Sequence, residues 1–381
     1  MKKKRNNFLK LMAICWFLLI AVFWIARIVK VDGDFSDSEN RVLASKPSMS
    51  VTDMTNGSYE SDYEVYVNDQ FPLRSLFVRG KVALDVMLGK KENNQVILAK
   101  DGYLFERFSA PEQKKSDAKA KKITQMCEKY PSINHYFMLV PTGVNILSDK
   151  LPAGIPVDDQ NKAMERFYQK LPQNVMKMID VRSVLSQHKD DALYYKTDHH
   201  WTTEAAYLCF RTVATVLGIN PDRVSYEIHP VTDQFKGSLL YKSGFRMGTE
   251  EKIDVYFPIA GNPGSIVSYT QEQKKTATFY NHDKLATRSG YEVFLDGNHS
   301  MVKIQTPIKD NHKVLLLFKD SYANCFIPFL APYYSEILVI DPRYYYDNVD
   351  ELITEEAVTD IMYLYNANTF FTDDTLTYVL N

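Results

Sequence analysis

The sequence predicts an α/β fold, a parallel β-sheet flanked by helices with a β-rich insertion, preceded by one transmembrane helix. Three observations support this prediction. One apolar run lies near the N-terminus, short apolar runs alternate with helical patterns from residue 111 onward, and turn residues crowd residues 224–311. Alternating strands and helices are typical of a parallel sheet with helices on both faces. The 381 residues, 45% of them hydrophobic, allow one large domain or two modest ones.

The first 30 residues have the pattern of a signal anchor. Basic residues 2–5 precede an apolar run over residues 8–29 that only Lys10 and Arg27 interrupt. A bilayer span needs about 20 apolar residues, and the long side chains of Lys10 and Arg27 can extend the run to both interfaces. Residues 25–29 are too bulky and charged for a signal-peptide cleavage site. We therefore expect an uncleaved single-pass anchor with a cytoplasmic N-terminus and an extracellular or periplasmic remainder.

The chain after the anchor begins with a tether and a helical segment. Residues 31–57 are rich in Asp, Ser and Asn, which predicts a tether. Apolar residues then recur at three- and four-residue steps over residues 58–90, which predicts helix. Residues 102–105 follow an Asp-Gly turn and predict a short strand. We assign residues 58–381 to one α/β domain.

The α/β part of this domain shows alternating strand and helix patterns. Thr202 is a suitable N-cap for a helix that stops at Gly218. Residues 224–311 differ, because they combine many turn residues with short alternating segments such as 291–295, and we expect a β-rich insertion there. A continuous apolar run predicts a buried strand over residues 133–140. Further strands are expected over 175–181, 192–195, 313–318, 336–340 and 361–365, and helices over 114–129, 159–171, 202–217 and 322–330.

Charge and cysteine content exclude some functions. The net charge of -2 provides no basic face for nucleic acid. Cys127, Cys209 and Cys325 lie outside the anchor, and their scattered positions match neither a disulfide framework nor a metal site. Two of these cysteines could pair, and the sequence does not say which.

Three residues with the chemistry of acyl transfer follow predicted strands. Ser321 lies between the strand at 313–318 and a helix, which exposes its hydroxyl and directs its backbone N–H toward a developing oxyanion. Asp198 and His200 are two residues apart after the strand at 192–195, so both can face one site. A carboxylate that orients an imidazole, which deprotonates a serine, is the arrangement of a Ser-His-Asp triad. The carboxyl ends of parallel strands meet at one edge of a sheet, where such groups can converge.

Metal binding is the alternative use of this histidine pair. Asp198, His199 and His200 are possible ligands, and His282, His299 or His312 could complete a site. These three histidines lie in turn-like stretches, where solvated side chains are usual. We therefore expect neither a metal nor a cofactor.

The segment Asp198-His199-His200-Trp201 resembles the motif of the DHHW family of exported bacterial proteins. That family is similar to the SGNH-hydrolase-like domains of alginate O-acetyltransferases. The resemblance covers nearly the whole chain after the anchor. It includes residues 101–105, the strand end at 140–142, Thr202 and the segment 319–324.

This resemblance implies a circularly permuted SGNH-like fold in which Ser321, His200 and Asp198 are catalytic. It implies transfer of an acyl group, most simply acetyl, to hydroxyls of a cell-surface or secreted polysaccharide, with a membrane-bound partner protein that delivers the acyl group. Two departures concern the oxyanion site. Lys319 stands where a glycine is usual before Asp-Ser, and the usual Gly and Asn donors have no clear counterpart, so Asn324, Arg343 and Gly237 are the candidates for oxyanion or substrate binding.

Two other functions fit the same residues. An esterase would pass the acyl group from Ser321 to water and needs only a different acceptor. A non-catalytic polysaccharide-binding or assembly protein would keep the fold, and the replacement of glycine by Lys319 favours that reading.

Overall fold

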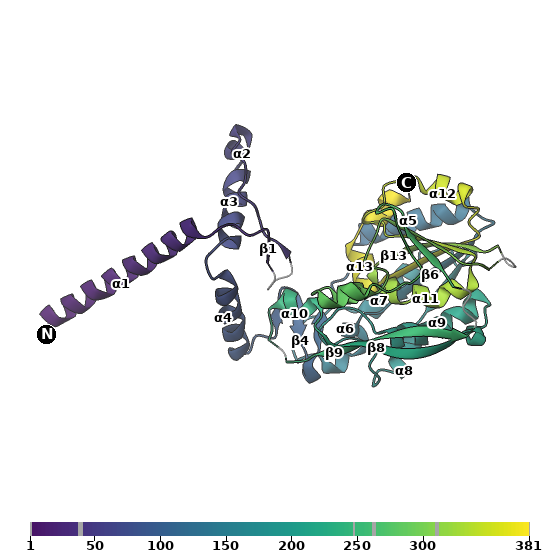
Figure 1. The fold of residues 1–381 in the computed structure, drawn as a ribbon, viewed down its shortest axis with the longest axis horizontal. Helices are drawn as coiled ribbons and strands as arrows, with labels where there is room; N and C mark the ends of the chain where they lie inside the picture. The colour runs from purple at the N-terminus through teal and green to yellow at the C-terminus, as the bar shows by residue number, and fades with distance from the viewer. Residues whose placement is uncertain (1, 37–40, 247, 261–263, 309–311, 381) are drawn as a thin grey trace. The chain divides into compact units, whose positions relative to one another are not determined.

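The computed structural model describes residues 2–36, 41–246, 248–260, 264–308 and 312–380 (Figure 1). The chain forms two compact units. Unit 1 contains Met1–Asn93 together with Tyr241–Arg246, and unit 2 contains Asn94–Leu240 and Met247–Asn381.

Unit 1 is built mainly from helices. Helix α1 (Lys2–Val29) includes the apolar stretch Arg5–Val29, which has a mean hydropathy of 2.4 and is long and apolar enough to cross a membrane. The segment expected to be a tether contains the pair β1 (Phe35–Ser36) and β2 (Arg41–Val42) and the short helix α2 (Val51–Asn56). The helical segment at 58–90 forms two helices, α3 (Ser58–Asp69) and α4 (Arg74–Met87), because Pro72 disfavours helix in the residue before it.

Unit 2 is organised around a mixed eight-stranded sheet. Five strands are parallel neighbours, in the order β14, β13, β15, β6, β7. The apolar runs of β14, β13, β15 and β6 are buried, as expected for strands covered on both faces, whereas β7 at the edge of the sheet alternates buried and exposed residues. The predicted strands are confirmed with these bounds: β6 (Asn134–Val140), β7 (Met176–Asp180), β13 (Val314–Lys319), β14 (Glu336–Ile340) and β15 (Asp360–Asn366).

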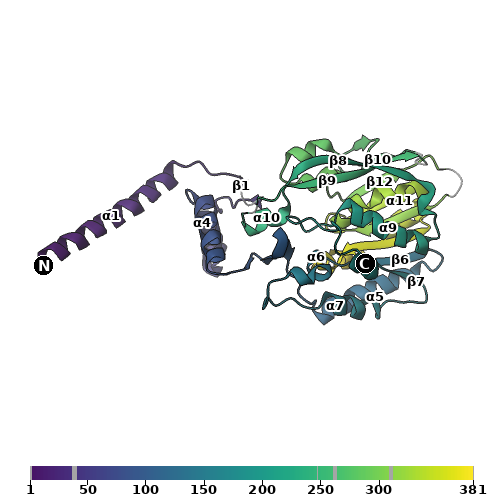
Figure 2. The ribbon, with the colours of Figure 1, turned by 90° about the horizontal axis from the view of Figure 1, so that it is seen from below.

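Helices cover both faces of this sheet (Figure 2). On one face α5 (Gln113–Lys129) and α12 (Val349–Glu355) are joined by the ion pair of Lys129 with Asp350. On the other face α9 (Thr203–Leu217) and α11 (Ile327–Leu330) meet through the rings of Phe210 and Phe329. Thr202 caps α9 as predicted, and Gly218 ends it with φ 66°. The principal helices are α5 (Gln113–Lys129), α7 (Gln160–Tyr168), α8 (Arg182–Gln187), α9 (Thr203–Leu217), α11 (Ile327–Leu330), α12 (Val349–Glu355), α13 (Ala367–Thr372) and α14 (Thr375–Val379).

The segment 224–311 supplies strands to two sheets. Strands β8 (Ser225–Phe235) and β9 (Glu251–Ala260) pair with each other. Strands β12 (Met301–Gln305), β10 (Ile266–Tyr269) and β11 (Lys274–Thr276) extend the central sheet in antiparallel fashion from β14. The β-rich character is therefore present, and part of the segment is continuous with the main sheet. Residues 309–311 at its expected end lie outside the described residues.

Two predicted strands are wrong. Residues 192–195 make only an isolated bridge between Tyr194 and Trp201, because this segment folds back on the loop that follows it. The N–H of Tyr195 donates to His200 O, which uses the backbone groups that a sheet would need. Residues 291–295 begin as a 3₁₀ turn, Gly290–Val293, and three successive residues with positive φ, 295–297, then exclude a strand.

Two predicted short elements also differ in detail. The expected strand at 102–105 is β5 (Leu104–Glu106), which pairs with β4 (Val96–Leu98). The expected helix at 322–330 divides into a 3₁₀ turn, Ser321–Cys325, and α11. Pro328 stands near the start of α11, where its missing N–H is not needed.

Candidate active site

The structure brings Asp198, His200 and Ser321 together. Asp198 and His200 lie in the loop before α9, and Ser321 follows β13 directly. His200 Nε2 lies 2.7 Å from Ser321 Oγ, and His200 Nδ1 lies 2.5 Å from Asp198 Oδ1. Asp198 and His200 are buried and Ser321 is half-buried. The three side chains thus form one hydrogen-bonded chain that ends at a hydroxyl which solvent can reach.

The position of Ser321 follows from the order of the strands. The chain runs from β13 to its neighbour β14 and then returns to β15 on the other side of β13. Such a reversal leaves a crevice at the carboxyl ends of the strands. Asp320 caps the turn beside this crevice by accepting from Tyr322 N, and its second oxygen accepts from the backbone and side-chain amides of Asn366. Two strand ends therefore fix the backbone on which Ser321 lies.

Backbone and carboxylate hydrogen bonds hold the loop that carries Asp198. Glu251 accepts from the N–H groups of Lys196 and Thr197 and from the Thr197 hydroxyl. Asp198 Oδ2 accepts from Ser238 N at 2.7 Å, and Asp198 Oδ1 also accepts from His200 N at 3.0 Å. Asp198 therefore has fixed donors on both oxygens and cannot rotate away from His200.

The histidine loop and the serine turn are joined directly. Trp201 Nε1 donates to Tyr322 O at 2.9 Å, and the Tyr322 hydroxyl donates to His199 O at 2.5 Å. The rings of Trp201 and Tyr322 are also stacked. These contacts give the tryptophan of the motif a structural role, because it ties the loop that carries His200 to the turn that carries Ser321.

An aromatic ring supports His200 from the insertion. Tyr291 is buried and stacks on the imidazole with ring centroids 3.5 Å apart and an interplanar angle of 8°. Sequence reasoning missed this residue, because it placed Tyr291 in a strand. Nothing in its local pattern indicates the imidazole as its partner.

Burial and charge set the protonation of the pair. Burial lowers the pKa of His200 to about 4, with His199 and Arg343 acting in the same direction and Asp198 opposing them. Burial alone would raise the pKa of Asp198, but His200, His199 and the N–H of Ser238 outweigh it and hold that pKa well below its usual value. At neutral pH the pair is therefore a carboxylate and a neutral imidazole, the form that can accept a proton from serine.

The side chain of Lys319, directly before Asp320, is buried. Its Nζ donates to Asn298 Oδ1 at 2.7 Å and to Asn324 Oδ1 at 2.9 Å, and it lies 3.4 Å from Asp341 Oδ2. Burial lowers the pKa of Lys319, and Asp341 opposes this shift. The Lys319 side chain thus joins Asp341 after β14, Asn324 in the serine turn and Asn298 after the turn at 295–297.

The three candidates for oxyanion or substrate binding have other partners. Asn324 Nδ2 donates to Gly297 O and Asn298 Oδ1, so its amide is held inside the Lys319 network. Arg343 forms a two-point ion pair with Asp341. Gly237 N donates to Thr197 Oγ1, so this donor is already used.

Gly237 has a steric role instead. A side-chain carbon at this position would lie 2.3 Å from Asp198 Cβ. Such a distance is impossible without movement of the backbone, so glycine is required for the close approach of residue 237 to the Asp198 loop.

A small pocket adjoins the pair on the side of Asp198. It encloses about 10 Å³, space for one water molecule. Its polar lining residues are Glu106, Thr142, Asp198, His199, Asn366 and Asn368. Asn366 is the last residue of β15 and Asn368 follows it in α13, and sequence reasoning missed both although they stand at the carboxyl end of a predicted strand.

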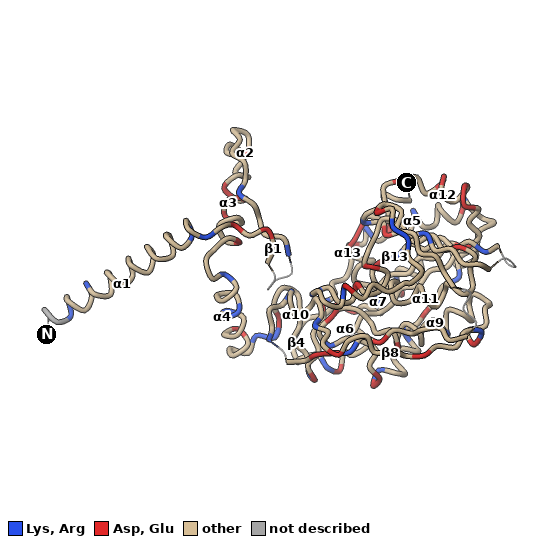
Figure 3. Tube along the Cα trace, in the orientation of Figure 1, with Lys and Arg blue, Asp and Glu red and all other residues tan. Residues whose placement is uncertain are grey.

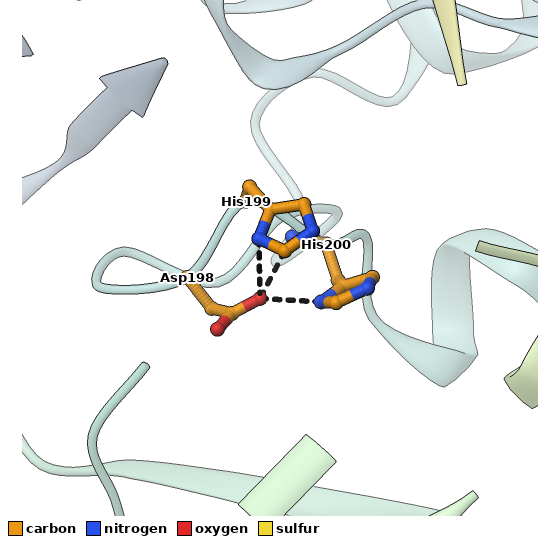
Figure 4. Close-up of side chains that lie close together, drawn as sticks. All are labelled: Asp198, His199 and His200. Atoms are coloured by element: carbon orange, nitrogen blue, oxygen red, sulfur yellow. Dashed lines mark hydrogen bonds and ion pairs between the residues drawn. The ribbon is translucent and has the colours of Figure 1, made fainter. Parts of the chain in front are cut away.

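Among the residues that the structure describes, Asp198, His199 and His200 form a group that could hold a metal ion (Figure 4). Figure 4 shows one carboxylate oxygen facing both imidazoles, 2.5 Å from His200 Nδ1 and 3.5 Å from His199 Nδ1. His199 Nδ1 also lies 2.8 Å from Ser238 Oγ. Of the distant histidines, His299 bonds to Glu272, and neither His282 nor His312 belongs to this group. All four cysteines are unpaired.

The fold and this site define an α/β protein with a serine, a histidine and an aspartate joined at the carboxyl edge of its sheet. The sequence matches the DHHW protein family over residues 87–340, and the chain belongs to this family. No curated protein matches the sequence.

Several solved structures share the fold. A DHHW family protein from Eubacterium siraeum is 20% identical with a TM-score of 0.64, covering 75% of this chain and 95% of that chain. Bacillus cereus PatB1 is 21% identical with a TM-score of 0.63, covering 72% of this chain and 97% of that chain, and a second PatB1 structure carries a sulfonyl adduct. The O-acetyltransferase domain of Pseudomonas putida AlgJ is more distant, with 14% identity, a TM-score of 0.47 and coverage of 73% of this chain and 92% of that chain.

Proposed function

We propose that the protein transfers an acyl group, most simply acetyl, through Ser321 to a hydroxyl of a cell-surface or secreted polysaccharide. The observation that carries this proposal is the hydrogen-bonded chain from Asp198 through His200 to Ser321, with Nε2 2.7 Å from Oγ. The sulfonyl adduct of PatB1 supports it, because sulfonyl groups add to activated nucleophiles.

The first half of the reaction forms an acyl-enzyme. His200 Nε2 accepts the proton of Ser321 as Oγ attacks the acyl carbonyl carbon. The tetrahedral intermediate collapses, the donor oxygen or sulfur leaves with the proton from Nε2, and Ser321 carries the ester. Asp198 stabilises the imidazolium that exists between these steps. The Ser321 backbone N–H stays our predicted oxyanion donor.

The second half reverses these roles with a new nucleophile. A sugar hydroxyl gives its proton to His200 Nε2 and attacks the acyl carbon of Ser321. The intermediate releases Ser321 Oγ, which recovers the proton, and the acylated sugar leaves. Water in place of the sugar would give an esterase, so the two functions share every step except the acceptor.

The location of the reaction follows from α1. We infer that α1 is an uncleaved anchor with the basic end in the cytoplasm, because the segment Arg5–Val29 is long and apolar enough to span the membrane. The site would then face the outside of the cell, where acyl donors such as thioesters are not made. A membrane-bound partner protein that delivers the acyl group is therefore part of the proposal.

The nucleophile can be tested by mass. We expect the protein to gain an acetyl or sulfonyl adduct from a small activated ester or a sulfonyl fluoride, and Ser321→Ala to gain none. Ser186→Ala, at an exposed serine on α8, is the matched control and should react as the parent does. Equal labelling of the parent and Ser321→Ala would exclude Ser321 as the nucleophile. Transfer of the acetyl group from Ser321 to an oligosaccharide rather than to water would separate transferase from esterase.

A further inference from the structure

We propose that the exposed apolar face of α4 lies in the outer interface of the membrane that α1 spans, so that unit 1 is held by the bilayer at two places. The partner is the lipid bilayer itself. This inference depends on α1 being a membrane anchor, and it is independent of acyl transfer.

The apolar face of helix α4 is exposed, whereas an amphipathic helix usually buries its apolar face. Large apolar side chains lie on one face at three- and four-residue spacing, and their exposed fractions range from 52% to 83%. Val82, on the opposite face, is the buried residue of this helix. The exposed face consists of Leu73, Leu76, Phe77, Leu84, Met87 and Leu88. Soluble proteins rarely leave such a continuous apolar face to water, and it marks an interaction site.

Contacts with α1 show what this face meets. The ring of Phe23 lies 5.4 Å from that of Phe71 and 5.8 Å from that of Phe77. Phe23 stands about 9 Å from the end of α1 at Val29, at ~1.5 Å per residue. If α1 spans the bilayer, Phe77 and the start of α4 therefore reach the depth at which interfacial helices lie, about 5–10 Å into the headgroup and acyl boundary.

Polar contacts fix this arrangement at the end of α1. Arg27 pairs with Asp32 at 3.0 Å and donates to the Tyr66 hydroxyl at 2.5 Å. Lys30 Nζ donates to Gln70 O, and the Gln70 amide bonds Gly33 through both its oxygen and its nitrogen. A tyrosine, a lysine and an arginine gathered where the apolar helix ends are the residues that anchor chains at a membrane surface. The apolar face of α4 is thus continuous with the membrane-spanning surface.

The charges beside the face suit lipid headgroups. Arg79 and Lys81 lie on α4 on either side of the apolar stripe, and Lys90 and Lys91 follow its end. Figure 3 shows basic segments along α4 and just after it. Basic residues that flank an apolar helical face are typical of helices that bind anionic membrane surfaces.

The test places a fluorophore on the full chain in vesicles. With Cys15 replaced by serine, the environment-sensitive dye NBD would be attached at Leu84→Cys in vesicles of phosphatidylcholine and phosphatidylglycerol. Ser75→Cys is the matched control, because it is exposed on the same helix but lies off the apolar face. We expect a blue-shifted emission at 84 that lipids with acyl-chain spin labels quench at least twofold more than the emission at 75.

Two further measurements keep the outcome decisive. Met87→Cys repeats the test at a second exposed position of the face, so that one misfolded variant does not decide it. Flotation with the vesicles reports the anchor separately, since it depends on α1. Flotation with equal quenching at 84, 87 and 75 would overturn the proposal and indicate that the face awaits a protein partner. Failure to float would overturn the anchor on which it rests, and neither result bears on Ser321.

Discussion

The pKa of His200 determines the pH dependence that we expect for labelling of Ser321. Burial lowers the pKa of His200 to about 4, which is below the value of the unfolded side chain, so the imidazole is neutral over the whole physiological range. A neutral imidazole is the form that accepts the Ser321 proton. We expect the rate of Ser321 labelling to be constant from neutral pH down to about 5.5, and to fall only as the pH approaches 4.

The measurement is the second-order rate of labelling by a sulfonyl fluoride between pH 4 and 8. His200→Gln should remove the fall in rate near pH 4 and lower the rate at neutral pH by about 10²–10⁴-fold, because no general base remains. An acid limb with a midpoint at or above the ordinary histidine value would show that His200 gains a proton more easily than its burial implies.

Tyr291 acts on the same imidazole through packing. Its ring lies 3.5 Å from that of His200 and nearly parallel to it, so it limits the rotation of the base. An aromatic pair is worth about 0.5–1.5 kcal/mol beyond burial. We expect Tyr291→Leu to lower the labelling rate by about 2–10-fold for that reason, whereas Tyr291→Phe keeps the ring and the rate. Equal rates in the two variants, each with an unchanged thermal midpoint, would assign Tyr291 a structural role only.

At the scale of elements, the loop of residues 196–201 depends on close packing against residue 237. A methyl group at Gly237 would lie 2.3 Å from Asp198 Cβ and 2.5 Å from its backbone. Overpacking typically costs about 1–3 kcal/mol. We expect Gly237→Ala to lose that much unfolding free energy in urea and to lose most of its labelling by a sulfonyl fluoride, because Asp198 and the base attached to it must move.

A glycine elsewhere in the same unit gives the control for this change. A side chain at Gly248 would meet nothing within 4 Å, so Gly248→Ala should match the parent in both measurements. Retention of labelling in Gly237→Ala would show that the loop can move without separating His200 from Ser321.

Sequence periodicity could predict the strands that are buried on both faces. The parallel strands β6, β13, β14 and β15 are buried on both faces, so their apolar runs are continuous and visible in the sequence. The short segment 192–195 has the same local pattern, but its backbone bonds to the next loop instead of a strand, and periodicity carries no information about that choice. The partners of Asn324 and Gly237 were likewise unpredictable, because Asn298 and Asp198 reach them only through the fold.

At the scale of the whole molecule, the order of motifs along the chain does not affect the site. Asp198 and His200 precede Ser321 by almost a third of the sequence, yet the fold brings the loop that carries them to Ser321, which follows β13 at the carboxyl edge of the sheet. The position of Ser321 could therefore be predicted from the strand that precedes it, whereas the position of Asp198 and His200 could not, because residues 192–195 are not a strand of the sheet. The division into two units could not be predicted either, because unit 1 recruits residues 241–246 from the middle of the chain.

Because residues 241–246 belong to unit 1, removal of the N-terminal part of this unit should affect them. Asn93 Nδ2 donates to Ser243 O at 2.7 Å. Val82 packs beside Gly244, since a Cβ atom added to this glycine would lie 3.5 Å from Val82 Cγ2. A chain that starts at residue 94 lacks both contacts, whereas a chain that starts at residue 31 keeps them. Losing a buried valine contact costs up to about 1.5–3 kcal/mol. We therefore expect trypsin to cut the shorter chain faster within 241–246, which contains Lys242 and Arg246, while cleavage within unit 2 stays the same. Equal cleavage of this segment in both chains would show that residues 241–246 hold their conformation without the N-terminal helices, and unit 2 would then be the smallest independent form of the protein.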